Sequence, residues 1–258
     1  MKKRVWITLL EKNEDLGRVI FEEMARYGLD PAGHFWEDDL ANMAWAGPIP
    51  DLVKPDCSVW VIVGQASRFA DPITRQGLGL LALAVRSAHG HNFPILISPS
   101  GGKVDVNALP TPLLGAESVP SGLGVKAVTR ASGIRPKDSA DYRLDVHPLP
   151  GLGLWFEIGP GRDPWKGAFL GCFGPSGIAP DAHGVGLAGT VPQNATLHYP
   201  VRGMKLAVSD REYVAWGVAN DLSPAESYYA RVTGAPHSLV FGPFPDGDDA
   251  EVFSVTLV

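Results

Sequence analysis

The stretch from Asp56 to Lys103 constrains the fold most, because two apolar runs flank a helical pattern within it. The run 58–63 (Ser-Val-Trp-Val-Ile-Val) is rich in β-branched and aromatic residues, which predicts a strand covered on both faces. Asp71-Pro72 predicts a helix N-terminus, and Gly90 can close that helix. The run 93–98 (Phe-Pro-Ile-Leu-Ile-Ser) predicts a second strand. Strand, helix and strand form a βαβ unit, which is right-handed and belongs to a parallel sheet.

The residues before this unit continue the same alternation of strands and helices. The segment 4–10 predicts another buried strand, and 34–36 is a candidate strand. Between Asp15 and Tyr27, apolar residues recur at helical spacing while the charged residues between them face solvent. We therefore expect an α/β domain over residues 1–118, with three layers and a mostly parallel sheet.

The composition changes near Ser121, where glycine, proline and short apolar runs begin to alternate. We find no amphipathic helix beyond this point, although Ser223–Glu226 resembles a capping box that would start a short helix through Arg231. Short strands with turn signals between them predict a mainly-β sandwich or barrel domain over residues 119–258. The candidate strands are 142–146, 152–158, 167–173, 195–199, 204–208, 213–218, 238–241 and 251–257.

Charge and hydropathy exclude several kinds of partner. The formal net charge is -6 and there is no dense cluster of lysine and arginine, which argues against nucleic acid. The apolar run 5–10 is too short for a signal peptide or a membrane span, so we expect a cytoplasmic protein with no membrane partner. Cys57 and Cys172 are expected to be buried thiols. Glycine-rich strands could leave a strand edge open, so a homo-oligomer is one alternative.

The carboxyl edge of the predicted parallel sheet is the expected place for a ligand. The segments 64–71 and 99–103 both lie there. In the second segment, consecutive glycines let backbone N–H groups approach an anion, and a lysine follows. This segment is not a Walker A loop, and the alternative is that both segments are ordinary surface loops. The candidate ligand-binding residues are Ser67, Arg68, Ser100, Gly101, Gly102 and Lys103.

Other motifs resemble known binding sites, but the residues around them do not support that function. Gly184–Gly189 matches the dinucleotide-binding pattern letter for letter, but no apolar strand precedes it and a proline follows where a helix should run. His89 and His91 have no acidic or cysteine partner close in sequence. His34 stands beside the acidic segment 37–39, which suits the start of a helix. No metal site is predicted, and the sequence assigns no cofactor.

The order of elements over residues 4–100 resembles a flavodoxin-like or TIR-like domain. The matching pieces are 5–8, the helix from Glu14, 36–38 and 59–63. TIR-like domains are scaffolds for assembly and signalling, and some cleave NAD with a glutamate on the helix after the third or fourth strand. The helix predicted from Asp71 contains no glutamate. The resemblance therefore favours recognition over NAD cleavage.

A second resemblance lies in the other half of the chain. The segment 213–223 is similar to the Asn-Asp-Val-Ser segment of the fumarylacetoacetate hydrolase family, whose metal ligands include an upstream Glu-x-Glu. Gly203 and Lys205 stand where those two glutamates would be. The carboxylates that a magnesium ion needs are therefore missing.

Two functions are left open by these patterns. The leading hypothesis is a non-catalytic module that binds a small anionic ligand or a protein partner through the carboxyl edge, because no catalytic constellation is complete. The alternative is an enzyme that acts on a small carbonyl or acyl substrate in a cleft between the two domains. Its residues to test are Lys205, Asp221 and His198. The sequence does not decide whether the protein is an enzyme.

Overall fold

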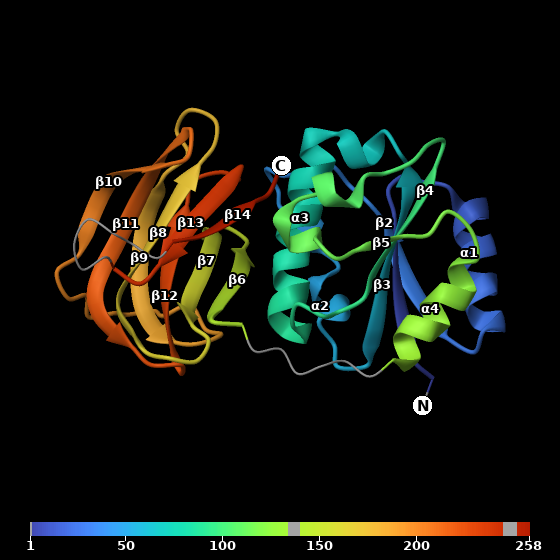
Figure 1. Cartoon of the computed structure of the whole chain (residues 1–258), viewed down its shortest axis with the longest axis horizontal. Helices are drawn as coiled ribbons and strands as arrows, with labels where there is room; N and C mark the ends of the chain where they lie inside the picture. Colours follow the sequence, from blue (N-terminus) through green and yellow to red (C-terminus); the bar gives the residue numbers. More distant parts are fainter. Residues whose placement is uncertain (1, 134–139, 245–251) are drawn as a thin grey trace. The chain divides into compact units, whose positions relative to one another are not determined.

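The computed structural model describes residues 2–133, 140–244 and 252–258, and it confirms an α/β part followed by a mainly-β part (Figure 1). Contacts between residues divide the chain into unit 1, Met1–Asp138 with Val258, and unit 2, Ser139–Leu257. Within the described ranges, no helix has the length and apolar character needed to cross a membrane.

A five-stranded parallel sheet with the order β2-β1-β3-β4-β5 forms the middle of unit 1. This is one of the common orders of doubly wound sheets. The strand β3 is buried along almost its whole length, as its continuous apolar run predicts. The five strands are β1 (Arg4–Leu9), β2 (Asp30–Phe35), β3 (Cys57–Gln65), β4 (Ile95–Ser100) and β5 (Glu117–Ser118).

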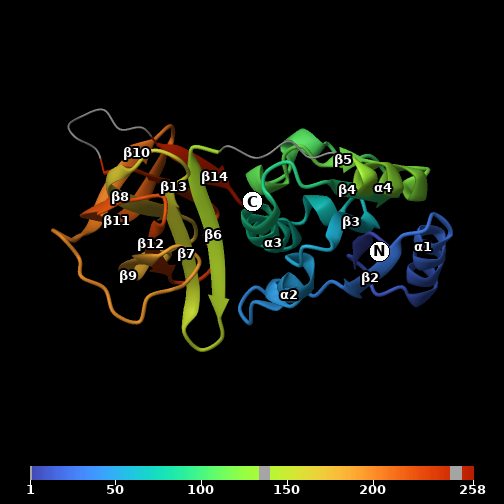
Figure 2. The ribbon, with the colours of Figure 1, turned by 90° about the horizontal axis from the view of Figure 1, so that it is seen from below.

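Helices cover both faces of this sheet. The helices α1 (Glu14–Arg26) and α4 (Leu123–Ser132) lie on one face, and α2 (Ile49–Leu52) and α3 (Pro72–His89) lie on the other (Figure 2). Unit 1 is therefore the three-layer α/β fold that the sequence predicts. Single 3₁₀ turns also occur at η1 (Ala44–Ala46), η2 (Arg68–Ala70), η3 (Val106–Ala108) and η4 (Thr111–Leu113).

The central βαβ unit is confirmed together with the signals that predict its helix. Asp71 caps α3 by accepting a hydrogen bond from the Thr74 backbone N–H at 2.9 Å, and Gly90 closes the helix with φ at 85°. The expectation of no helix after Ser121 was wrong, because α4 packs in the core of unit 1. Its buried residues are mostly small, Leu123, Gly124, Ala127 and Ala131, so its apolar pattern is weak.

Unit 2 contains two antiparallel sheets, as the mainly-β prediction requires. One has the order β6-β7-β12-β9 and the other β10-β11-β8-β13-β14. Apolar side chains from alternate positions, such as Leu144, Phe156 and Tyr228, are buried. The strands are β6 (Tyr142–Leu149), β7 (Gly153–Pro160), β8 (Trp165–Phe173), β9 (Pro180–Leu187), β10 (Val201–Val208), β11 (Arg211–Leu222), β12 (Glu226–Val232), β13 (Ser238–Gly242) and β14 (Phe253–Thr256).

Two expectations about unit 2 were wrong, and one strand was not predicted. The segment 195–199 forms no strand, whereas the Gly-rich segment 180–187 forms β9. The helix expected from Ser223 is the strand β12. The Ser223 hydroxyl does donate to Glu226 at 2.8 Å, but this contact belongs to a turn in which the Glu226 N–H donates to the Ser223 carbonyl at 2.9 Å. The contact between Ser223 and Glu226 therefore exists as predicted, but it stabilises a turn before a strand rather than the start of a helix.

The two cysteines are buried thiols, as expected. Burial raises the pKa of the Cys172 thiol to about 12, so this group is not a thiolate near neutral pH.

Candidate functional site

The carboxyl ends of β3 and β4 lie side by side, with Gln65 opposite Ser100. The Ala66 N–H donates to the Ser100 carbonyl oxygen at 2.8 Å, which ties the two following loops together. The loops also touch, because a Cβ atom at Gly102 would lie 3.1 Å from the Cβ of Ala66. The structure thus brings the predicted ligand-binding segments to one edge of the sheet.

Arg68 is held in place by Asp38, which follows β2. The Asp38 carboxylate also accepts hydrogen bonds from Trp36 Nε1 and from Thr74 Oγ1, each at 2.9 Å. Burial alone would raise the pKa of Asp38, but the hydrogen bonds from Arg68, Thr74 and Trp36 lower it. The Nε of Arg68 is buried and has no hydrogen-bond partner among the described residues.

The loop after β4 presents donors to solvent. Gly101 has a φ of 69°, a conformation that favours glycine, and the residues from Ser100 to Lys103 are exposed. In the described part of the chain, the backbone N–H groups of Gly101, Gly102 and Lys103 have no acceptor, and the Lys103 ammonium has no ion-pair partner. The Ser67 side chain makes no capping hydrogen bond to η2.

The three residues proposed for an enzyme do not come together as one group. Lys205 pairs with Glu212 at 3.0 Å and lies opposite Val214. Asp221 lies seven residues beyond Val214 along β11, which at about 3.3 Å per residue places it about 23 Å away. His198 is near Asp221, since its backbone bonds to Ala219 and Asn220. Lys205 is therefore separated from the other two.

His34 lies partly buried on the edge strand β2. Its Nδ1 accepts a hydrogen bond from Trp6 Nε1 at 3.1 Å, and its ring lies between those of Trp6 and Trp36. Nε2 is buried without a hydrogen-bond partner in the described ranges. Burial lowers the pKa of His34 to about 4, so the imidazole is neutral near pH 7.

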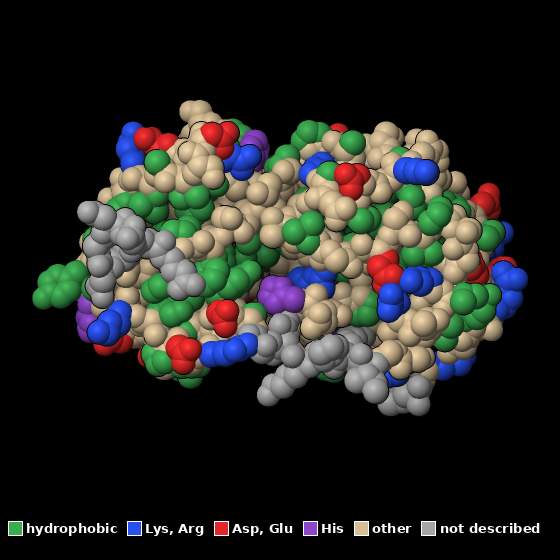
Figure 3. All heavy atoms as spheres, in the orientation of Figure 1, with side chains coloured by type: hydrophobic (Ala, Val, Ile, Leu, Met, Phe, Trp, Pro, Cys, Tyr) green, Lys and Arg blue, Asp and Glu red, His purple; other side chains and the backbone are tan. Residues whose placement is uncertain are grey.

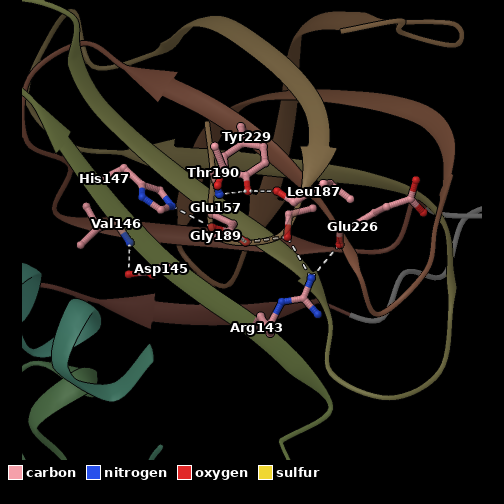
Figure 4. A network of polar contacts seen from close by, with 11 residues as sticks. Arg143, Asp145, Val146, His147, Glu157, Leu187, Gly189, Thr190, Glu226 and Tyr229 are labelled. Carbon is pink, nitrogen blue, oxygen red and sulfur yellow. Dashed lines mark hydrogen bonds and ion pairs between the residues drawn. The ribbon is translucent and has the colours of Figure 1, made fainter. Parts of the chain in front are cut away.

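Unit 2 contains a polar cluster that the sequence analysis missed (Figure 4). At its centre is Glu157, whose side chain is only 4% exposed. Its Oε2 lies 2.7 Å from His147 Nε2, while its Oε1 accepts hydrogen bonds from Ser227 Oγ at 2.6 Å and from the Gly189 N–H at 2.9 Å. Asp145 lies directly opposite Glu157 across the β6–β7 pair.

The pKa values in this cluster reflect its pairing. Burial would lower the pKa of His147, but the hydrogen bond to Glu157 and the charge of Asp145 raise it. Burial would raise the pKa of Glu157, but its hydrogen bonds from His147, Ser227 and Gly189 lower it. The pair is thus stabilised as imidazolium and carboxylate in spite of its burial.

Two further side chains frame the cluster. Arg143 donates to the carbonyl oxygens of Pro160, Pro224 and Glu226 at 2.5 to 2.6 Å, and to Ser227 Oγ at 2.9 Å. The Tyr229 hydroxyl donates to the carbonyl oxygen of Leu187, the last residue of β9, at 2.5 Å, and its ring centroid is 5.8 Å from that of His147. Arg143 therefore joins β6 to β7 and to the start of β12.

One signal for this cluster was available in the sequence. Asp145 and His147 are two residues apart in a predicted strand, so they share a face. Leu144 and Val146 alternate with them and point into the core. What the sequence does not reveal is the register that places Glu157 opposite Asp145.

Comparison with models of known protein families gives no match, and no curated protein matches the chain. The two resemblances noted from the sequence therefore stay predictions.

Proposed function

We propose that unit 1 is a non-catalytic module that binds a small anionic ligand at the carboxyl edge of its sheet. The observation that carries this proposal is that two loops in contact there, 66–71 and 100–103, combine the Arg68 guanidinium with exposed N–H groups that have no acceptor among the described residues. Ligands of doubly wound sheets bind at this edge, where loops and helix N-termini converge.

The donors suit an anion with several oxygen atoms. The Arg68 side chain is 28% exposed, so its guanidinium adds positive charge at the edge although its Nε is buried. Asp38 engages the other end of this guanidinium, so Arg68 is positioned before a ligand arrives. The free N–H groups of Gly101 and Gly102 can approach an oxygen closely because no side chain shields them. Lys103 adds a positive charge.

The positive charge that attracts an anion would come from Arg68 and Lys103 rather than from an extended basic surface. On the face seen in Figure 3, acidic and basic side chains are interspersed over unit 1 rather than gathered in one basic patch. Asp38 accepts three hydrogen bonds and has a lowered pKa. Asp38 is therefore unsuited to act as a general base. A second carboxylate at this edge, Glu11, accepts a hydrogen bond from the Gln65 N–H at 3.0 Å.

The test is an NMR titration of the ¹⁵N-labelled full chain with inorganic pyrophosphate at constant ionic strength. We expect saturable shifts of the backbone amides of Gly101, Gly102 and Lys103 and of the Arg68 Nε–H. Lys103→Ala should weaken binding about fivefold, which corresponds to about 1 kcal/mol for an exposed charge.

The matched control is Lys3→Ala, because Lys3 is also exposed but lies before the amino end of β1. Its affinity should equal that of the unmodified chain. The proposal fails if pyrophosphate gives no saturable shift at this edge, or if Lys103→Ala and Lys3→Ala weaken binding equally.

A further inference from the structure

We propose that Asp145, His147 and Glu157 of unit 2 form a binding site for a divalent transition-metal ion of the zinc type. One potential ligand atom from each residue lies within 4.8 Å of the other two. Asp145 and His147 are on β6, and Glu157 is opposite Asp145 on β7. Because residues i and i+2 of a strand share a face, all three side chains project from the same side of the sheet.

The carboxylate of Glu157 is oriented as metal-bound carboxylates are. Its Oε1 is held by Ser227 Oγ at 2.6 Å and by the Gly189 N–H at 2.9 Å, which leaves Oε2 directed at His147 (Figure 4). Hydrogen bonds of this kind fix the ligating atoms of metal sites and are part of what determines affinity. Ser227 is itself fully buried, so this support is rigid.

The charge of the cluster favours a cation. Two carboxylates face one imidazole, so the three groups carry a net charge of -1 even when His147 is protonated. Glu157 is 97% buried, where unbalanced charge is costly. The guanidinium of Arg143 forms its hydrogen bonds to backbone carbonyls and to Ser227, not to either carboxylate. The two carboxylates attract a divalent ion.

The three ligand atoms, one imidazole nitrogen and two carboxylate oxygens, indicate which metal ions the site would bind. Magnesium and calcium prefer oxygen ligands alone, whereas one imidazole nitrogen with two carboxylate oxygens suits zinc and its neighbours. Three protein ligands also leave a fourth position for water. The His147 side chain is 18% exposed, so an ion can reach the cluster from solvent.

Binding would replace one proton with the ion. His147 Nε2 and Glu157 Oε2 are 2.7 Å apart and share a hydrogen bond. In a tetrahedral site with ligand bonds of about 2.0–2.1 Å, the same atoms would be about 3.3 Å apart. The ion takes the place of the shared proton, which is released to solvent. A small movement of the partly exposed His147 ring is enough.

The test uses the full chain after removal of metals with a chelator. Native mass spectrometry with one equivalent of zinc should show a one-to-one adduct that is lost on denaturation, and cobalt(II) should give the visible absorption of a tetrahedral complex. His147→Gln and Asp145→Asn should abolish both signals. Ser227→Ala should weaken zinc binding about 10–100-fold, the usual effect of losing a group that orients a ligand.

His91→Gln is the matched control, because His91 is exposed and lies in unit 1. It should bind zinc like the unmodified chain. Circular dichroism melting checks that each variant is folded. If His147→Gln does not fold, the isosteric variant Asp145→Asn tests zinc binding in its place. A chain that forms no zinc adduct, or an adduct that persists in folded Asp145→Asn, would overturn the proposal. Neither outcome affects the pyrophosphate test of unit 1.

Discussion

Acidification from pH 6.5 to pH 4 should destabilise unit 1 through His34. Burial holds the pKa of this imidazole at about 4 in the folded protein, against 6.5 when it is exposed. Protonation would place a charge between Trp6 and Trp36 and break the hydrogen bond that Nδ1 accepts from Trp6 Nε1 at 3.1 Å. Between pH 6.5 and pH 4, His34 is therefore protonated in the unfolded chain but stays neutral in the folded protein.

The size of the effect follows from proton linkage. The stabilisation is fully present above pH 6.5 and is lost as the pH falls toward 4. In this window the unfolded chain binds one more proton than the native state, so the free energy of unfolding falls by about 1.4 kcal/mol per pH unit. Over the interval down to pH 4 the total loss is about 3 kcal/mol. Below pH 4 the native state also binds the proton, and the loss through His34 stops.

The assay is urea unfolding between pH 4 and pH 8, followed by tryptophan fluorescence, for the unmodified chain and for His34→Phe. Phenylalanine keeps an aromatic ring beside both tryptophans but cannot titrate. It removes the acceptor for Trp6, which should cost about 1 kcal/mol at every pH above 6.5. The stabilities of the two proteins should converge and then cross as the pH falls. Parallel pH profiles, or a His34 pKa near 6.5 by NMR, would refute the reasoning.

Two further changes test packing in unit 1. Arg86→Met should lower the free energy of unfolding by about 3–5 kcal/mol in urea titrations. The buried guanidinium donates to backbone carbonyls on several segments, and methionine cannot make these hydrogen bonds. A loss below about 1 kcal/mol would contradict this prediction. Gly33→Ala should cost at least about 2 kcal/mol in the same assay, since its Cβ would lie 2.2 Å from the Ile7 carbonyl oxygen. Gly47→Ala, whose nearest atom is 3.3 Å away, is its control and should change stability by less than about 1 kcal/mol.

The β3–α3–β4 unit could be predicted from the sequence because every signal that specifies it is local. The buried run of β3, the Asp71 cap and the closing Gly90 are all read within a few residues of where they act. The carboxyl edge follows from this unit by a general rule, so its two loops could be placed together in advance.

The missed elements depend on partners distant in sequence. The strand β9 was not recognised because Gly184 and Gly186 lack side chains, yet small residues are needed there: a Cβ at either position would lie 2.9–3.0 Å from Pro192. The interactions of the two candidate sites are also non-local. Arg68 and Asp38 are 30 residues apart, and Glu157 and Ser227 are 70 apart. Without strand register, no pattern in the sequence links these pairs.

The contacts of Glu157 have a consequence for the order of folding. They join β7 to β6, to β12 and to the loop after β9, so the side chain finds its partners only once all three are in register. The contacts with Gly189 and Ser227, which are 32 and 70 residues away, follow costly loop closure, so we expect them to form late. Interactions that are absent from the transition state slow unfolding rather than speed folding. We therefore expect loss of the Glu157 contacts to shorten the lifetime of the folded sheet more than it slows folding.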